Sequence, residues 1–346
     1  MRVAVIGTGS MGGRHAQLLA GMPGVDEVLV VDAVPSRAEA VARDTGARVM
    51  AHDAALDAAD AVVVATPAHL HASTVEAAIM RGLPTLCEKP LTDELDSSAA
   101  LVARVEAAGA HVEVGFHRRH DPAYVAGRER VADGAAGRIH LLRLTAFDPR
   151  VTPRPIGEWT PGETAPLFLH SSIHDFDFVR WISGQEVVEV TADGSGRDDP
   201  RPDDARGVES ATVSMRLSGG TLAVLEATWL HPAGYDSRVE LVADRAHLSI
   251  GLSERTPTEL LGWDPAPAGE PWAGYLDRFA AAYRAELVAF VAAARGERPP
   301  ASTARDGLEA HRIAVAATRA YLERRIVRLD EVRDHTVPAA SATPNQ

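Results

Sequence analysis

The strongest constraint on the fold lies in the first twelve residues, where a short apolar run leads into a glycine-rich turn. Residues 3–6 are apolar, and Gly7-Thr8-Gly9-Ser10-Met11-Gly12 follows in the pattern G-x-G-x-x-G. In a strand–turn–helix unit, the first glycine makes the tight turn, the second admits a pyrophosphate and the third lets the helix pack on the strand. The helix N-terminus then binds the anion. The opening of the chain therefore predicts a dinucleotide-binding unit.

An acidic residue follows this turn at the distance that nucleotide recognition requires. Asp32 lies about 20 residues after Gly12, at the end of an apolar run over residues 28–31. A carboxylate there accepts hydrogen bonds from the adenosine ribose hydroxyls and repels a 2′-phosphate. We therefore expect NAD as the cofactor. NADP is less favoured but stays open, because Arg37 is close enough to hold a 2′-phosphate.

Two halves of the chain differ in their hydrophobic pattern. Residues 1–120 alternate apolar strand-like runs (3–6, 28–31, 61–65, 85–87, 112–115) with helical stretches (12–20, 36–45, 72–81, 94–108), which predicts a doubly wound α/β Rossmann domain. Residues 121–333 contain runs of alternating apolar and polar residues (138–147, 211–217, 220–229, 237–243), with Gly219-Gly220 as a hairpin turn. They predict an α+β domain with an open-faced, mostly antiparallel sheet, closed by helices at 275–294 and 304–323. We expect loops at 149–165, 194–206 and 262–273, and a disordered tail at 334–346.

Composition narrows the classes of function. Lys and Arg total 35 against 48 Asp and Glu, a net charge of −13. Binding to nucleic acid or to an anionic membrane needs a basic face, so we expect neither. The single cysteine, Cys87, excludes an intramolecular disulfide and a cysteine-rich zinc site, and we expect it to be buried in a strand. With no apolar stretch of signal or membrane type, we predict a cytoplasmic protein.

Two short motifs fall where parallel strands are expected to end. Thr66-Pro67, with His71 close behind, follows the run at 61–65, and Glu88-Lys89-Pro90 follows the run at 85–87. Open α/β sheets bind ligands at these carboxyl ends. Lys89 is the only lysine in the chain, and a lysine, unlike an arginine, can lose its proton and ends in a compact ammonium. We therefore place Lys89 at the site. The residues expected to border the cofactor there are Thr66, Pro67, His71 and Glu88.

A histidine-containing run in the second half offers proton-transfer chemistry. Residues 170–177 read His-Ser-Ser-Ile-His-Asp-Phe-Asp and predict the start of a helix that runs to Trp181. The i, i+4 spacing places His170 and His174 on one face, and Asp177 follows three residues later. An imidazole there can exchange a proton with a substrate hydroxyl near neutral pH, as hydride transfer requires. A zinc site and a helix cap are the alternatives, and zinc is disfavoured because no third ligand is evident.

Together these residues resemble the Gfo/Idh/MocA family of NAD(P)-dependent sugar and cyclitol dehydrogenases over nearly the whole chain. The shared marks are the glycine motif, Thr66-Pro67 with His71, Glu88-Lys89-Pro90, the run at 114–121 and Ile173-His174-Asp175-Phe176-Asp177. The Gly-Phe-x-Arg-Arg run at 115–119 and Gly234-Tyr235-Asp236 are most similar to inositol 2-dehydrogenases. The resemblance implies a C-terminal sheet that carries the substrate and mediates oligomers, here a homodimer or homotetramer.

The resemblance also implies roles for individual residues. Lys89 would polarise the reacting oxygen of a polyol, cyclitol or sugar, and His174 would take its proton while the nicotinamide accepts hydride. Arg118, His170, Asp177 and Tyr235 would line the polyol site, with Asp177 close to His174.

His170 stands where the family usually carries an aspartate that contacts the substrate hydroxyls. A neutral imidazole supplies no fixed negative charge, so the pairing with Lys89 and the basicity of His174 should both change. We expect a shifted substrate, such as another cyclitol, an amino-sugar or a keto-sugar. Two other functions stay open: an NAD-using glycosidase or epimerase that releases no net NADH, and a non-catalytic NAD-sensing regulator.

Overall fold

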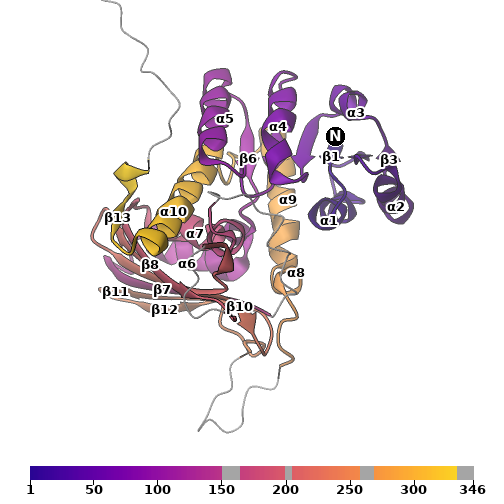
Figure 1. Ribbon diagram of the computed structural model, residues 1–346. Coiled ribbons are helices and arrows are strands. Elements are labelled where there is room, and N and C mark those ends of the chain that lie inside the picture. The colour runs from indigo at the N-terminus through magenta and orange to yellow at the C-terminus, as the bar shows by residue number, and fades with distance from the viewer. Residues whose placement is uncertain (150–163, 199–204, 258–268, 333–346) are drawn as a thin grey trace, which may run out of the picture.

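The structure, a computed structural model, describes residues 1–149, 164–198, 205–257 and 269–332. Two sheets follow one another along the chain, and helices fill the space between them (Figure 1). The expected tail at 334–346 lies outside the described residues. So do nearly all of the expected loop at 149–165 and parts of those at 194–206 and 262–273.

Six parallel strands form the first sheet, in the order β3-β2-β1-β4-β5-β6. Its central strands are apolar runs because helices cover both faces. The order reverses between β1 and β4, and open α/β sheets bind their ligands at such a switch point. The predicted doubly wound domain is confirmed, and the structure adds the short elements β3 and α3. The strands are β1 (Arg2–Ile6), β2 (Glu27–Val31), β3 (Arg48–Val49), β4 (Ala61–Val64), β5 (Thr85–Cys87) and β6 (Val112–Val114), and the helices are α1 (Ser10–Leu19), α2 (Pro35–Thr45), α3 (His52–Ala58), α4 (His71–Ile79) and α5 (Leu95–Ala108).

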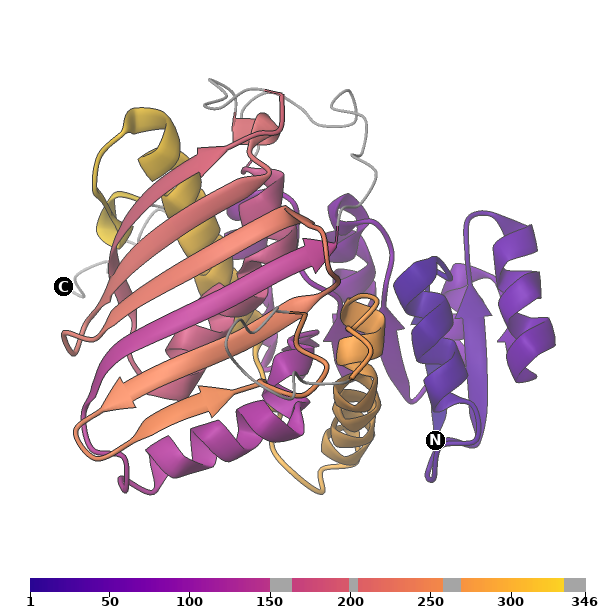
Figure 2. The same cartoon turned by 90° about the horizontal axis from the view of Figure 1, so that it is seen from below.

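Seven strands form the second sheet, in the order β12-β11-β7-β10-β9-β8-β13. All neighbours are antiparallel except β7 and β10, so the predicted mostly antiparallel sheet is confirmed. Figure 2 shows one broad face of this sheet uncovered, with helices behind it. Three of the strands, β8, β12 and β13, were not predicted. The strands are β7 (Ile139–Pro149), β8 (Val187–Ser195), β9 (Ser210–Leu217), β10 (Leu222–His231), β11 (Asp236–Ala243), β12 (His247–Ile250) and β13 (Val327–Arg328).

The helices of the second half are α6 (Pro122–Ala132), α7 (Ile173–Ser183), α8 (Tyr275–Arg278), α9 (Ala280–Ala294) and α10 (Ala304–Glu323). The single helix predicted over 275–294 is wrong at Phe279, where the backbone leaves helical geometry between α8 and α9. The Phe279 ring is fully buried, and its centroid lies 4.6 Å from that of His117 and 6.0 Å from that of Tyr235. The helix is therefore interrupted at the residue whose ring packs in the core. Helix α10 begins where predicted, at a capping box of Thr303 and Asp306.

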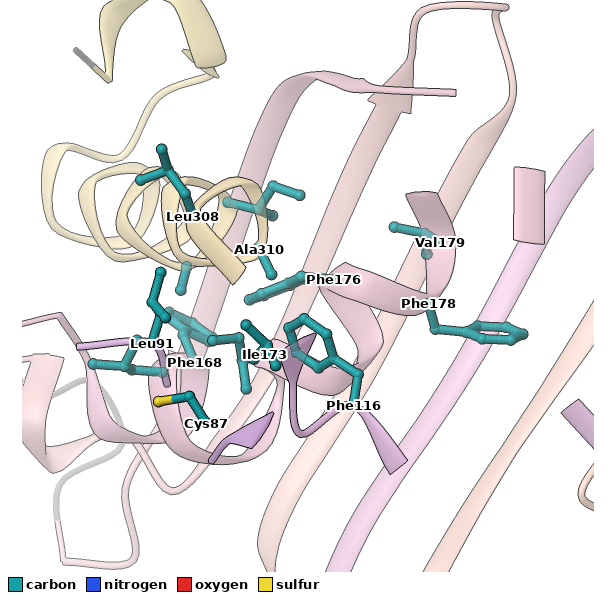
Figure 3. Packing of buried hydrophobic residues seen from close by; sticks show 14 of the residues in the cluster. Cys87, Leu91, Phe116, Phe168, Ile173, Phe176, Phe178, Val179, Leu308 and Ala310 are labelled. Carbon is teal, nitrogen blue, oxygen red and sulfur yellow. The ribbon is translucent and has the colours of Figure 1, made fainter. Parts of the chain in front are cut away.

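Two clusters of buried side chains hold the molecule together. The larger one extends from the first sheet, where it includes Ile6 and Leu29, to the second sheet, and it contains Cys87, Phe168 and Leu308 (Figure 3). Cys87 is fully buried, as predicted. The smaller cluster joins β1, β2 and α1 to Leu287 and Phe290 of α9. A late helix thus completes the core of the first sheet. Among the described residues, no helix combines the length and apolar character needed to cross a membrane.

Candidate active site

The glycine turn between β1 and α1 is shaped by close contacts on one side and open space on the other. A β-carbon on Gly12 would lie 1.8 Å from the carbonyl oxygen of Gly7, and one on Gly7 would lie 2.6 Å from that of Ala65. A β-carbon on Gly9 would meet no atom of the described residues within 4 Å. Helix α1 starts at Ser10 without a side-chain cap, so its first N–H groups are available to an anion. The turn fits a dinucleotide pyrophosphate.

Asp32 lies beside this turn, as the sequence predicts. Its Oδ2 accepts hydrogen bonds from the main-chain nitrogen of Thr8 at 2.7 Å and from the Thr8 hydroxyl at 2.9 Å, and its Oδ1 accepts one from Val34 at 2.8 Å. Burial acts to raise the pKa of Asp32, but these hydrogen bonds and the charge of Arg37 hold it below its usual range. A carboxylate accepts about four hydrogen bonds, so capacity for a ribose hydroxyl remains.

His71 ties together the loops that follow β4 and β5. The ring is 1% exposed, with Nδ1 3.0 Å from the carbonyl oxygen of Pro90 and Nε2 2.8 Å from that of Thr66. Burial lowers its pKa, and a neutral ring donates to only one of these carbonyls at a time. His71 therefore helps to position both loops through their main-chain carbonyls. The Thr66 hydroxyl is buried and has no partner among the described residues.

Glu88 pairs with a histidine that the sequence analysis missed. Its Oε1 lies 2.6 Å from Nε2 of His15, on α1, and its Oε2 accepts from the main-chain nitrogen of Lys89 at 3.2 Å. Burial acts to raise the pKa of Glu88, but the His15 ring and then the Lys89 charge hold it below its usual range. The only signal for His15 was its place three residues after Gly12, on the helix that the motif opens.

Lys89 reaches from the end of β5 to the second half of the chain. Its peptide bond to Pro90 is cis, and its Nζ donates a hydrogen bond to the main-chain carbonyl of His170 at 2.7 Å. His170 lies in a π-helical turn, Leu167–Ser171, and α7 begins only at Ile173. The helix predicted from residue 170 is thus divided into a π turn and α7, and the shared face of His170 and His174 stays a prediction. Among the described residues, no cluster of three His, Cys, Asp or Glu side chains is placed to hold a metal ion.

His174 lies in the first turn of α7, and its side chain is largely buried. Its exposed fraction is 8%, and Nδ1 has no hydrogen-bond partner among the described residues. Burial lowers the pKa of His174 well below its ordinary value, and His117, Lys89 and Arg118 lower it further. The ring is therefore neutral near pH 7 and can accept a proton. Because Lys89 Nζ bonds to the main chain of His170, four residues before His174, the structure brings the two predicted catalytic residues into one region.

Arg118 and Tyr235 are also brought together, and both lie near the Phe279 ring. The guanidinium of Arg118 lies 5.6 Å from the Phe279 ring centroid, and the Tyr235 centroid lies 6.0 Å from it. Arg118 donates to Asp175, which follows His174 on α7. The charge of Arg118 acts on the pKa of Tyr235, against the larger effect of burial, which raises it.

Asp148, near the end of β7, is a site residue that the sequence analysis missed. Burial raises its pKa to about 6, against the charges of Arg118 and Lys89 and a hydrogen bond from Ser171. The Ser171 hydroxyl also accepts from the Trp229 indole nitrogen at 2.7 Å. Asp148 thus carries a carboxylate toward both cations of the site. It lies one residue beyond the strand predicted at 138–147, outside any motif.

Asp177 is directed to a different partner from the one the resemblance implied. Its Oδ2 accepts from Nε of Arg119 at 2.9 Å, and its Oδ1 accepts from Nη2 of the same guanidinium. Arg119 also donates to Asp306 at the start of α10. Both oxygens of Asp177 are engaged in this ion pair, so its predicted contact with substrate has no support in this geometry and stays a prediction.

Comparisons with known proteins identify the family of the chain. Residues 1–116 match an oxidoreductase family with an NAD-binding Rossmann fold, and residues 124–249 match the GFO/IDH/MocA C-terminal domain. The chain is 38% identical to the myo-inositol dehydrogenase Hyg17 of Streptomyces leeuwenhoekii, over 92% of this chain and 97% of that one. It is 31% identical to an inositol 2-dehydrogenase of Rhizobium meliloti, over 94% and 98% of the two chains.

Solved structures give the same result. The crystal structure of scyllo-inositol dehydrogenase from Lactobacillus casei, with bound NAD(H) and scyllo-inositol, superposes with a TM-score of 0.85 at 25% identity and covers 95% of this chain and 99% of its own. A putative myo-inositol dehydrogenase from Sinorhizobium meliloti gives 0.84 at 29% identity, with 95% and 99% covered. The family models and these relatives cover both halves of the chain, and this chain belongs to the GFO/IDH/MocA family of oxidoreductases.

Proposed function

We propose that this protein is an NAD-dependent dehydrogenase that moves hydride between the nicotinamide and a secondary alcohol or ketone of a cyclitol or sugar. One observation carries the proposal. The ammonium of Lys89 and the neutral imidazole of His174 come from different halves of the chain and interact at the edge of the sheet where the glycine turn fits a pyrophosphate. An acid and a base placed at a dinucleotide site are what alcohol oxidation needs.

The chemistry divides between two side chains. When bound, the nicotinamide supplies the hydride acceptor. Lys89 donates a hydrogen bond to the reacting oxygen and stabilises the negative charge that develops on it. His174 takes the hydroxyl proton, because burial and the neighbouring cations keep its ring unprotonated. In ketone reduction the same proton returns from His174 to the oxygen.

A substrate with several hydroxyl groups suits the lining of this site. The Asp148 carboxylate accepts hydrogen bonds, the Arg118 guanidinium donates them and the Tyr235 hydroxyl does both. Relatives named as inositol dehydrogenases support a cyclitol. Asp148 also offers Lys89 the negative charge that the His170 side chain does not supply. We propose that this exchange shifts substrate preference, and an unchanged preference of His170→Asp across a polyol panel would remove the idea.

Two finer assignments belong to the same proposal. NAD is preferred over NADP because the Asp32 carboxylate, held ionised by Thr8 and Val34, repels a 2′-phosphate. The protein assembles as a homodimer or homotetramer in the cytoplasm, through the uncovered face of the second sheet. Size-exclusion chromatography with light scattering tests the assembly, and a monomer at micromolar concentration contradicts it.

The deciding experiment follows NADH absorbance with NAD and then NADP against myo-inositol, scyllo-inositol, glucose and aminocyclitols. We expect NAD reduction by at least one cyclitol, and a loss of about 10²–10⁴-fold in kcat for Lys89→Met and for His174→Ala. Both variants should bind NAD as the wild type does, measured by calorimetry, because neither side chain belongs to the glycine turn.

Two outcomes would favour the other functions. Conversion of a glycoside or an epimer without NADH accumulation indicates an enzyme that oxidises and re-reduces its substrate. NAD binding without conversion of any substrate in the panel indicates a regulator.

A further inference from the structure

A histidine that removes a proton through one ring nitrogen must carry a hydrogen on the other. That second N–H is usually fixed by an acceptor, and the acceptor determines which tautomer is present. A buried N–H without an acceptor is costly. The partner of the second nitrogen of His174 therefore bears directly on its basicity.

The structure offers an unusual neighbour for that position. Nδ1 of His174 is buried without a partner among the described residues, and the ring that packs on it is His117. The two ring centroids are 4.4 Å apart with planes at 65°. His117 is 3% exposed, and its Nε2 is likewise buried without a partner in the described part of the chain. Two imidazoles thus meet, each with an unsatisfied nitrogen.

The position of His117 is fixed from its other sides. It belongs to the 3-10 turn His117–His120, and its ring centroid lies 4.6 Å from that of Phe279 and 4.5 Å from that of Tyr283. These contacts come from the break before α9 and from α9 itself, so the ring is held in place by a separate element. These contacts fix where the ring lies, while the broad χ2 profile of histidine leaves its tilt adjustable.

We propose that His117 is a positioning residue for His174: a ring nitrogen of His117 accepts the Nδ1–H of His174 in the working enzyme and so directs Nε2 to the substrate hydroxyl. Hydrogen bonds of catalytic groups are often long or poorly aligned before substrate binds, which fits the edge-on arrangement seen here. No proton leaves His174 through this contact. The inference rests on the proposed dehydrogenase function.

The charges around the pair decide the direction of the pH effect. Burial lowers the pKa of His117 well below its ordinary value, and the nearby cations lower it further. His117 is therefore neutral in the working range and has a lone pair to offer. In the arrangement seen here His117 lowers the pKa of His174. In the proposed hydrogen-bonded arrangement a neutral His117 accepts from Nδ1–H and favours protonated His174, so its removal from the working enzyme should lower that pKa. The groups that face the pair are Lys89 after β5, Arg118 and His120 of the same turn, Arg278 of α8, Tyr283 of α9 and Asp175 of α7, which is paired with Arg118.

Three variants separate this role from packing. His117→Phe keeps an aromatic ring between Phe279 and Tyr283 but removes both nitrogens, and His117→Asn restores an acceptor. His120→Phe makes the same chemical change in the same turn, at a residue that is not among the groups acting on the pKa of His174. With NAD and the best polyol, we expect His117→Phe to lower kcat about 10- to 100-fold, as the loss of a hydrogen bond to a charged group implies. Its KM for the polyol should change less than about twofold.

The pH profile and the rescue complete the kinetic test. The acidic limb of kcat should move to lower pH in His117→Phe and return toward the wild-type position in His117→Asn, while His120→Phe behaves as wild type. Unchanged kcat and pH profile in His117→Phe would overturn the proposal. So would an equal loss in His117→Phe and His117→Asn, since that indicates packing alone.

A second measurement does not depend on turnover. Nitrogen NMR of labelled histidines in the wild-type protein saturated with NAD reports which ring nitrogen of His174 carries the proton. We expect Nδ1–H, and a mixture of tautomers in His117→Phe. An Nε2–H tautomer in the wild type would contradict the inference even if the enzyme is active. If no polyol is oxidised, the proposed function fails, and this measurement still decides whether the imidazole pair exists.

Discussion

The cofactor side and the substrate side of the site are built in opposite ways. On the cofactor side the shape of the backbone forms the site. Three glycines shape the turn, and Asp32 accepts three hydrogen bonds from Thr8 and Val34. On the substrate side, charged side chains from several elements converge. Buried polar atoms there have no partner in the described residues, among them His174 Nδ1, Arg118 Nε and Asp175 Oδ2.

This difference reflects two tasks. The cofactor side binds the same dinucleotide every time, whereas the substrate side has to select one substrate among many. An unsatisfied buried polar atom costs stability, so it persists where a ligand will satisfy it. The glycine turn needs only the shape that every dinucleotide shares. The substrate side keeps unused donors and acceptors, whose arrangement can select one hydroxyl pattern over another.

The largest expected effect comes from substituting a glycine on the cofactor side. Gly12→Ala places a methyl group 1.8 Å from the Gly7 carbonyl oxygen, so the helix must shift. We expect the free energy of unfolding to fall by about 1–3 kcal/mol and NAD binding to be lost. In Gly9→Ala, the added methyl group lies in open space as long as no cofactor is bound. It should leave unfolding within about 0.5 kcal/mol of wild type, yet weaken NAD about tenfold where the pyrophosphate would lie.

Chemical denaturation and calorimetry on the two glycine variants check this pair. Equal loss of stability in both would show that the turn is constrained throughout, contrary to the open space above Gly9.

An intermediate effect belongs to the substrate side. The folded pKa of Asp148, about 6, lies above its ordinary value of 3.8, so the folded state favours the protonated acid. That contribution to stability is complete below the unfolded pKa and is lost as pH rises through the folded pKa. Asp148→Asn should therefore be more stable than wild type by about 1–3 kcal/mol at pH 8, with the difference vanishing near pH 4.

The same variant should have a polyol KM raised about tenfold, because one charged acceptor is lost. Urea denaturation at both pH values and steady-state kinetics measure the two effects. A variant that is less stable than wild type at pH 8 would contradict this. It would show that attraction to Arg118 and Lys89 outweighs the cost of burying the Asp148 carboxylate.

The smallest effect tests the edge of the cofactor side. Arg37 is exposed and acts on Asp32 only through its charge. Arg37→Ala should change NAD affinity by less than about twofold, since exposed charge pairs contribute little. Asp32→Ala is the matched variant and should both weaken NAD and admit NADP. A large loss of NAD affinity in Arg37→Ala would place this side chain on the nucleotide itself.

The sequence predicted the first sheet, and where the cofactor-side residues lie on it, because these signals are local. The glycine motif, Asp32 and Glu88-Lys89-Pro90 each lie within a few residues of the strand that positions them. Prediction from the sequence failed where the geometry depends on residues far away in the chain. The π turn at Leu167–Ser171 has the same apolar pattern as a helix, and Asp148 carries no motif because its role depends on Lys89 and Arg118, which belong to other elements.

The packing of α9 has a consequence for how the protein is made. Leu287, Phe290 and Val291 complete a core whose other members, including Val3 and Leu19, are synthesised first. At translation rates of about 5–20 residues per second, this apolar surface of the nascent chain waits roughly 10–50 s for its cover. The N-terminal part therefore leaves the ribosome as an unfinished layer that chaperones can recognise. A truncation that ends before α9 should aggregate rather than yield a stable nucleotide-binding fragment.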